Sequence, residues 1–277
     1  MIVFLNGHFV PEAGAVVPVN DRGFMYGDGL FETIRVVSGR PFRMAQHLER
    51  LTRGAAFLKI QPPFTPAQME QFAGELIAQN QLTEAVLRVT LTRGPGGRGY
   101  TPGPAGQPTT VMTLHPTPPL KPPVEWSLIT SSFRIPAADP LAPFKTSSRI
   151  VNVMARVEAA EKGADEALLL NTKGEVAEAA SGNLFWIDAD QIGTVPTDQG
   201  VLPGVTRALV LEICQGLGLR TSQRPMQPEA LRHARGIFVT QSVFGIVPII
   251  LLDGAPVPRS PRVDQIAAAY NEMLRRA

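Results

Sequence analysis

A lysine near the middle of the chain stands in the segment Ala142-Pro143-Phe144-Lys145-Thr146. It is followed in order by Asp165-Glu166-Ala167-Leu168-Leu169-Leu170, Glu178, Asn183-Leu184-Phe185-Trp186 and Leu202-Pro203-Gly204-Val205-Thr206-Arg207. A lysine amine forms a Schiff base with an aldehyde only after it loses its proton, and apolar neighbours such as Phe144 favour the neutral amine. Lys145 is therefore the candidate nucleophile of this chain.

Length and composition are typical of a soluble protein with more than one domain. The chain has 277 residues, of which 44% are hydrophobic and 18% are charged, so it can bury a sizeable core. The formal net charge of +2 is too small to indicate nucleic-acid binding, so a small-molecule ligand is favoured. We find no apolar stretch of membrane-spanning length and no basic leader, and we expect a cytoplasmic location.

The cysteine and histidine content argues against two kinds of site. Cys214 is the single cysteine, so no intrachain disulfide can form, and its apolar helical surroundings predict a core position. The four histidines are scattered without the spacing that metal ligands need. We therefore expect no metal site.

Residues 1–115 are expected to form an amino-terminal α+β domain. Asn6-Gly7 lies between two β-rich runs, which predicts a hairpin. Thr65 precedes a proline at the start of an apolar helical pattern and is a plausible helix cap. The other expected elements are strands over 30–37, 85–92 and 109–115 and helices over 45–58 and 66–80.

Residues 116–124 are expected to link this domain to a second one over residues 125–277. The tightest cluster of prolines in the chain, Pro116 to Pro123, lies there between two strand-like runs. Beyond it, strand-like and helical segments alternate, which predicts a mixed α/β domain. The expected strands cover 126–131, 167–171, 184–188, 237–240 and 247–252, and the expected helices cover 149–162, 205–217 and 262–275.

The motifs that follow Lys145 are typical of a site for pyridoxal 5'-phosphate. Glu178 shares a strand face with Val176, so we expect it to be partly buried, where it could keep a pyridine nitrogen protonated; the alternative is an exposed edge residue. Pro203-Gly204-Val205-Thr206 is a glycine turn at the start of a helix, where free N–H groups attract a phosphate. Arg50 could be a second phosphate ligand or simply a solvated helix charge.

Together these residues resemble the fold-type IV pyridoxal-phosphate enzymes, or class IV aminotransferases, from Asn6-Gly7 to about Pro248. The family includes branched-chain and D-amino-acid aminotransferases and 4-amino-4-deoxychorismate lyase. The resemblance implies a homodimer of two-domain, D-amino-acid aminotransferase-like subunits with the cofactor between the domains. It implies Lys145 as the Schiff-base lysine and proton shuttle and Glu178 on the pyridine nitrogen. The other implied cofactor contacts are Arg50, Leu202, Gly204, Val205, Thr206 and Thr240 or Gln241.

Local patterns favour the lyase within this family. The segment Gly29-Leu30-Phe31-Glu32-Thr33 has threonine where branched-chain enzymes tend to have glycine and D-amino-acid enzymes valine, and Arg93 to Tyr100 resembles the Arg-Gly-x-x-x-Arg-Gly-Tyr of the lyases. Aminodeoxychorismate carries two carboxylates, which suit arginine side chains. The resemblance thus implies Thr33 as proton donor and, as substrate contacts, Phe31, Arg93, Arg98, Tyr100 and Arg149.

Three questions stay open at this level. The first is whether the protein is instead an aminotransferase that acts on D-amino or branched-chain amino acids. Its reaction would share with the lyase every step up to the carbanion that forms when the substrate carbon loses its proton. A non-catalytic binding protein on the same fold is a third possibility, against which the presence of both Lys145 and Glu178 argues. The sequence also leaves open whether Arg93, Arg98 and Arg149 face the substrate or pair with acidic neighbours.

Overall fold

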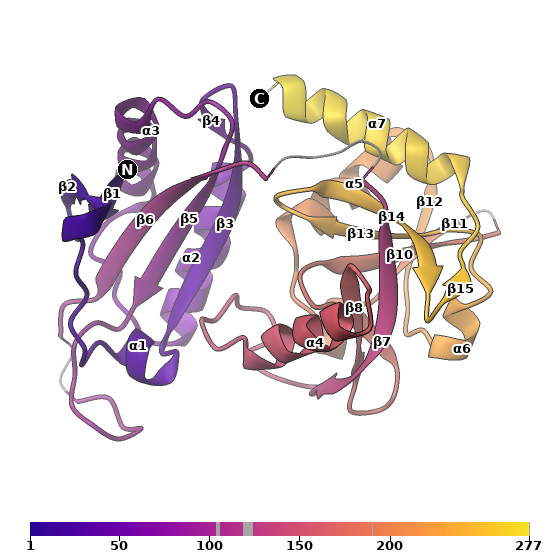
Figure 1. The fold of residues 1–277 in the computed structure, drawn as a ribbon, viewed down its shortest axis with the longest axis horizontal. Helices are drawn as coiled ribbons and strands as arrows, with labels where there is room; N and C mark the ends of the chain where they lie inside the picture. The colour runs from indigo at the N-terminus through magenta and orange to yellow at the C-terminus, as the bar shows by residue number, and fades with distance from the viewer. Residues whose placement is uncertain (104–105, 119–123, 190, 277) are drawn as a thin grey trace. The chain divides into compact units, whose positions relative to one another are not determined.

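The computed structural model describes residues 1–103, 106–118, 124–189 and 191–276, which divide into two compact units (Figure 1). The first unit comprises Met1–Pro118 together with Phe144–Ser148, and the second comprises residues 124–143 and Arg149–Arg276. Of the expected linker, residues 119–123 lie outside the described residues. The lysine segment, which the sequence placed in the second domain, clusters with the first unit because Phe144 packs on its apolar core.

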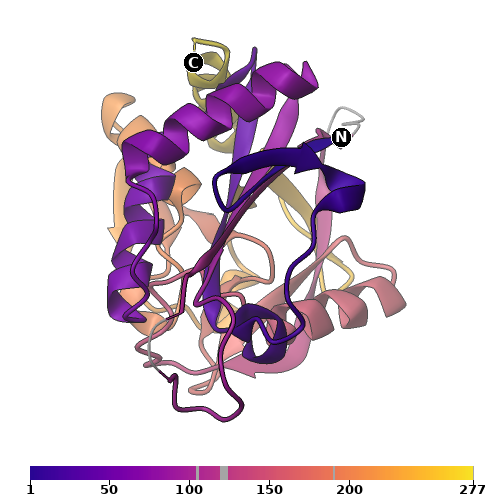
Figure 2. The same ribbon diagram turned by 90° about the vertical axis from the view of Figure 1, so that its left-hand side faces the viewer.

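The first unit is built on an antiparallel sheet whose strands lie in the order β2-β1-β6-β5-β3-β4. Helices α2 and α3 pack on it, and Figure 2 shows them from a second direction. Its elements are β1 (Ile2–Leu5), β2 (His8–Pro11), the 3-10 turn η1 (Glu12–Gly14), α1 (Arg22–Tyr26), β3 (Gly29–Val37), β4 (Arg40–Pro41), α2 (Met44–Phe57), α3 (Pro66–Asn80), β5 (Ala85–Thr92) and β6 (Thr109–Pro116).

Alternation along β3 decides which side chains face the helices of this unit. Leu30, Glu32 and Ile34 are buried on the helix side, whereas Phe31 and Thr33 point to the opposite face and are half-buried. This second face of the sheet therefore presents the residues that the sequence associated with substrate.

Local signals in the first unit were confirmed. Asn6 (φ 51°) and Gly7 (φ 94°) form the left-handed turn of the β1–β2 hairpin, a conformation that Asn-Gly adopts readily. Thr65 and Gln68 form a reciprocal capping box at the start of α3.

The second unit is built on a mixed sheet in the order β12-β11-β10-β13-β14-β7-β8-β9, with β15 added on β14. The pairs β7/β8, β7/β14 and β11/β12 are parallel. Its elements are β7 (Trp126–Ile135), α4 (Ile150–Glu161), β8 (Glu166–Asn171), β9 (Val176–Ala179), β10 (Asn183–Asp188), β11 (Gln191–Thr194), the 3-10 turn η2 (Thr197–Gln199), α5 (Val205–Gly216), β12 (Arg220–Gln223), α6 (Pro228–Leu231), β13 (Ile237–Gln241), β14 (Gly245–Leu252), β15 (Ala255–Pro256) and α7 (Pro261–Arg276).

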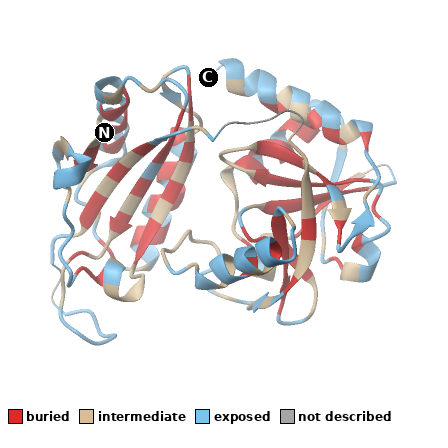
Figure 3. Ribbon diagram, in the orientation of Figure 1, coloured by how far each residue is buried: buried red, intermediate tan, exposed pale blue. Residues whose placement is uncertain are grey.

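Strands β8, β10 and β13 of this sheet are buried on both faces over most of their length, and Figure 3 shows buried residues in red. The Phe185 and Phe238 rings stack with centroids 4.9 Å apart, and Trp186 is fully buried. Cys214 on α5 is buried as expected, and burial raises the pKa of its thiol to about 11. None of the described helices combines the length and apolar character that a membrane span requires.

Candidate active site

Lys145 is held beside β3 in the first unit by backbone hydrogen bonds. Phe31 N donates to Lys145 O at 2.9 Å, and Ser147 N donates to Gly29 O at 2.8 Å. The segment therefore extends the sheet along the part of β3 that β4 leaves unpaired. The Lys145 amine Nζ lies 4.6 Å from the centroid of the Phe31 ring. The structure thus places the candidate nucleophile close to Phe31, an expected substrate contact.

Arg88 lies on the same face and was missed by sequence reasoning. It is the register partner of Thr33 across β3 and β5, and its guanidinium carbon lies 4.0 Å from the centroid of the Phe31 ring. The signal was present, because strand alternation puts a charged residue on the face opposite the apolar Leu87 and Val89. Lys145, Thr33 and Arg88 therefore gather around one aromatic ring.

Arg50 is buried in the first unit and not solvated. It donates from Nε to Glu32 Oε1 at 2.8 Å and from NH2 to Glu32 Oε2 at 2.7 Å. His47 Nδ1 lies 2.7 Å from the same Oε2. Burial raises the pKa of Glu32, but hydrogen bonds and charges from Arg50 and His47 outweigh burial and hold that pKa at about 2. Glu32 is thus an anion that orients Arg50.

His47 belongs to the same cluster and keeps a neutral ring. Burial lowers its pKa, Glu32 opposes that shift, and the charges of Arg50 and Lys145 lower the pKa further. Sequence reasoning missed Glu32 and His47, although His47 and Arg50 are three residues apart and so share one helix face.

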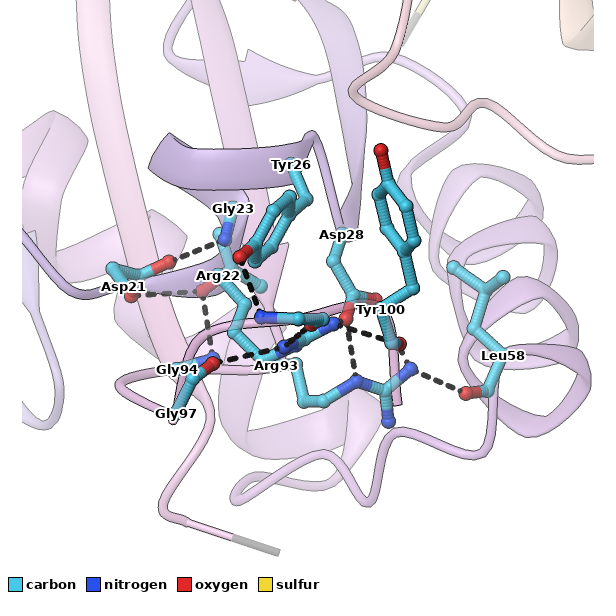
Figure 4. A network of polar contacts seen from close by, with 12 residues as sticks. Asp21, Arg22, Gly23, Tyr26, Asp28, Leu58, Arg93, Gly94, Gly97 and Tyr100 are labelled. Atoms are coloured by element: carbon cyan, nitrogen blue, oxygen red, sulfur yellow. Dashed lines mark hydrogen bonds and ion pairs between the residues drawn. The ribbon is translucent and has the colours of Figure 1, made fainter. Parts of the chain in front are cut away.

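In the loop after β5, Arg93 is fixed by hydrogen bonds, whereas Arg98 and Tyr100 are exposed. Arg93 donates to both carboxylate oxygens of Asp28, at 2.7 and 3.0 Å, and to the carbonyls of Leu58 and Lys59, as Figure 4 shows in part. Arg93 therefore pairs with an acidic neighbour, the second of the two options left open by the sequence. Arg98 and Tyr100 are exposed, Tyr100 by 90%.

Glu178 lies on β9 of the second unit and is only 7% exposed, which excludes the exposed-edge alternative. Its Oε2 accepts hydrogen bonds from Leu202 N at 3.0 Å and Asn183 Nδ2 at 3.2 Å. Asn183 Nδ2 also donates to Leu202 O at 2.7 Å, so this amide joins the strand to the loop before α5. Asn183 is a second residue to which the sequence gave no role. Arg149, the remaining arginine candidate, is the residue before α4 in this unit.

The start of α5 has the features of an anion cradle. Gly204 is the N-cap residue and no side chain caps the helix, so its first N–H groups are available to a ligand. A Cβ on Gly204 would lie 2.1 Å from Asn183 Oδ1, so the close approach requires glycine. The buried Thr240 hydroxyl has no hydrogen-bond partner among the described residues, and Thr206 is also buried. These donors fit the phosphate of the expected cofactor. Gln241 lies at the end of the same strand as Thr240, with its Nε2 3.4 Å from Ser181 Oγ.

Residues 29–252 match the family described as amino-transferase class IV. The chain belongs to the class IV aminotransferases. A protein of Methanocaldococcus jannaschii assigned as a branched-chain-amino-acid aminotransferase is 34% identical over 99% of this chain and 96% of its own. The D-alanine aminotransferase of Bacillus licheniformis is 30% identical over 99% and 98%. The aminodeoxychorismate lyase of Bacillus subtilis is 28% identical over 91% and 87%.

Solved structures of class IV aminotransferases show the same fold. The branched-chain aminotransferase of Thermoproteus uzoniensis with norvaline superposes with a TM-score of 0.92 at 27% identity and covers 99% of this chain and 95% of its own. The T.th. branched-chain amino acid aminotransferase with pyridoxamine 5'-phosphate gives 0.93 at 28% identity, with 99% and 93% covered. The expected family, fold class, enzymatic nature and pyridoxal 5'-phosphate cofactor are thereby confirmed.

Proposed function

We propose that this class IV enzyme is a 4-amino-4-deoxychorismate lyase that forms 4-aminobenzoate and pyruvate for folate biosynthesis. The observation that carries the proposal is the pairing of Thr33 with Arg88 on the sheet face where Lys145 lies over Phe31. A hydroxyl on the sheet face where the amine lies can donate a proton to a leaving group, and the guanidinium of its register partner suits a substrate carboxylate. The similarity to the Bacillus subtilis lyase supports the same assignment.

The roles of the residues follow from their chemistry. Pyridoxal 5'-phosphate supplies an aldehyde for the substrate amine and a ring that withdraws electrons when its nitrogen is protonated. Glu178 would keep the proton on that nitrogen, and Arg50, the start of α5 and Thr240 would bind the phosphate. Lys145 would hold the aldehyde of the cofactor and would be the base that takes the proton from the amine-bearing carbon of the substrate.

The second half of the reaction uses Thr33. Its hydroxyl protonates the departing three-carbon group, which leaves as pyruvate, and the remaining ring becomes aromatic. Arg88 and Arg98 bind the two substrate carboxylates, and Phe31, Tyr100 and Arg149 complete the substrate contacts. The remaining proposed cofactor contacts are Leu202, Gly204, Val205, Thr206 and Gln241. We include homodimer assembly and a cytoplasmic location in the proposal.

Transamination is the second candidate, favoured by the 34% and 30% identity to proteins assigned as aminotransferases. In that reaction Lys145 would take the same proton, the cofactor would supply the carbon that accepts it, and the substrate would leave as a keto acid. The two functions therefore use the same residues and differ in the fate of one proton.

The deciding experiment is incubation of the purified protein with aminodeoxychorismate and, separately, with D-alanine and isoleucine. We expect stoichiometric 4-aminobenzoate and pyruvate from the first and a persistent visible absorption band of the bound cofactor with the others. Lys145→Ala should lose both products and the band, while the matched change of the exposed Lys173→Ala should keep them. Absence of both products in the unaltered enzyme would reject the lyase, and loss of the band with single amino acids would establish transamination.

A further inference from the structure

Arg22 on α1 is a buried arginine to which the reaction gives no role. It is 4% exposed, and its guanidinium donates to three carbonyls of one loop: to Gly97 O at 3.2 Å and Gly99 O at 2.9 Å from NH1, and to Tyr100 O at 3.2 Å from NH2. Figure 4 shows this arrangement from close by. One side chain thus holds the backbone on both sides of Arg98.

Other residues around α1 bind the same loop. The Tyr26 hydroxyl accepts a hydrogen bond from Gly99 N at 2.9 Å, and its ring lies 5.8 Å from the Tyr100 ring. Arg22 N donates to Gly94 O at 2.9 Å, and Gly96 N donates to Asn20 O at 3.1 Å. The loop is therefore attached to α1 along its length.

Asp28 fixes the guanidinium of Arg22 from the other side. Arg22 Nε donates to Asp28 Oδ2 at 2.9 Å, and the same carboxylate binds Arg93 through both oxygens. Burial raises the pKa of Asp28, but the hydrogen bonds and charges of the two arginines outweigh it and lower that pKa overall. Asp28 therefore stays ionised, and every Arg22 side-chain nitrogen is used within the protein.

The loop depends on these hydrogen bonds for its order because it is rich in glycine. Gly94, Gly96, Gly97 and Gly99 fall within six consecutive positions, and glycine loses more backbone freedom on ordering than any other residue. A loop without fixed contacts would be ordered only when substrate binds, at the expense of affinity. The contacts of Arg22 order it beforehand.

We propose that Arg22 is a positioning residue for substrate: it fixes the backbone of residues 97–100 so that Arg98 and Tyr100 are presented together to a substrate carboxylate. The inference rests on the proposed function insofar as it makes Arg98 and Tyr100 substrate contacts. Arg22 acts through them, because its donors are bound to Asp28 and to the loop carbonyls.

The test compares Arg22→Gln and Arg22→Lys with the matched control Arg53→Gln, an exposed arginine on α2. Lysine keeps the positive charge opposite Asp28, but its single nitrogen cannot span three carbonyls as the planar guanidinium does. Two properties are measured in the folded enzyme with cofactor: the rate of trypsin cleavage after Arg98, and kcat and KM for whichever carboxylate-bearing amine the unaltered enzyme turns over.

For both Arg22 variants we expect cleavage after Arg98 to accelerate about tenfold and KM to rise about tenfold, the change that loss of one charge-assisted hydrogen bond produces. We expect kcat to stay within about twofold and the cofactor absorption band to be unchanged, because only the recognition of substrate is weakened. Unchanged cleavage and KM in the variants would overturn the proposal. So would equal losses of kcat, cofactor band and Tm in both variants, which would indicate a purely structural role.

The cleavage rate needs no substrate, so this test is separate from that of the reaction. If aminodeoxychorismate is not cleaved but an amino acid is transaminated, the lyase assignment fails while the Arg22 measurement proceeds with that amino acid.

Discussion

Arg50 binds both carboxylate oxygens of Glu32, with Nε 2.8 Å from Oε1 and NH2 2.7 Å from Oε2. Both side chains are buried, and Glu32 comes from strand β3 while Arg50 comes from helix α2. A planar guanidinium held through two bonds has little rotational freedom. The arginine proposed for the phosphate is therefore oriented by the sheet before any ligand binds.

Replacing Glu32 should destabilise the first unit. We expect Glu32→Gln to lower the free energy of unfolding by about 3 kcal/mol, because it leaves the buried Arg50 charge without its counterion. Urea unfolding of the cofactor-free protein measures this change. The control Glu49→Gln, an exposed glutamate on the helix that carries Arg50, should change stability by less than about 0.5 kcal/mol. Equal effects of the two substitutions would contradict the argument.

His47 should make stability depend on pH near neutrality. Its pKa is lowered in the folded state, chiefly by burial, so the unfolded chain binds a proton first as the pH falls below the ordinary value of 6.5. Stability is fully present above that value and is lost as the pH falls towards the folded pKa. We expect His47→Gln to flatten the dependence below about pH 6.5, measured by urea unfolding at each pH. Persistence of the slope in His47→Gln would assign it to other groups.

A separate acidic transition should come from Glu32. Its folded pKa of about 2 lies below the ordinary 4.5, so its contribution is present above pH 4.5 and is lost as the pH falls towards 2. The shift corresponds to about 3 kcal/mol in total. Acid titration of the unfolding free energy should therefore show less loss in this range for Glu32→Gln than for the unaltered protein. An identical loss in both proteins would show that other carboxylates control the transition.

Arg88 should govern affinity for a substrate carboxylate. We expect Arg88→Gln to raise KM between about tenfold and a hundredfold, with a smaller change in kcat, because one charge-assisted hydrogen bond to the substrate is lost. Steady-state kinetics measure both constants, and Arg53→Gln again serves as the control. A fall in kcat at constant KM would instead place Arg88 in the chemical step.

Gly204, the N-cap residue of α5, and Gly216, its last residue, offer a matched pair. A methyl group at position 204 would lie 2.1 Å from Asn183 Oδ1 and displace the amide that binds Glu178, whereas a methyl group at position 216 would meet no described atom within 4 Å apart from its chain neighbours and the backbone of its own helix. We expect Gly204→Ala to weaken cofactor binding at least about tenfold, since a displaced hydrogen-bond partner costs over 1 kcal/mol. Gly216→Ala should leave binding unchanged and raise stability by up to about 1 kcal/mol. Titration with pyridoxal 5'-phosphate, followed by absorption, measures the binding.

Elements with local signals were predictable from the sequence. The hairpin at Asn6-Gly7, the capped helix Pro66–Asn80 and the strand Ala85–Thr92 depend on neighbours within a few positions. The expected helices over 149–162 and 205–217 end within one residue of α4 and α5 for the same reason.

Contacts between distant segments were not predictable. Glu32 reaches Arg50 across 18 positions, and Arg93 reaches Asp28 across 65. No local pattern states that such charges will meet, because a buried partner is chosen by tertiary packing. The sequence favoured partial burial of Glu178 but left an exposed position open for a related reason: β9 is buried on both faces, and the residues packed against it come from distant parts of the chain.

The assignment of Phe144–Ser148 to the first unit also constrains how the gene can be divided. A gene truncated by a stop codon in the proline-rich stretch after β6 would encode all the helices and strands of that unit but would omit Lys145, the proposed Schiff-base lysine. One cut in that stretch therefore cannot separate the chain into its two compact units. A complementation experiment with separate halves would require the second polypeptide to deliver its lysine to the first.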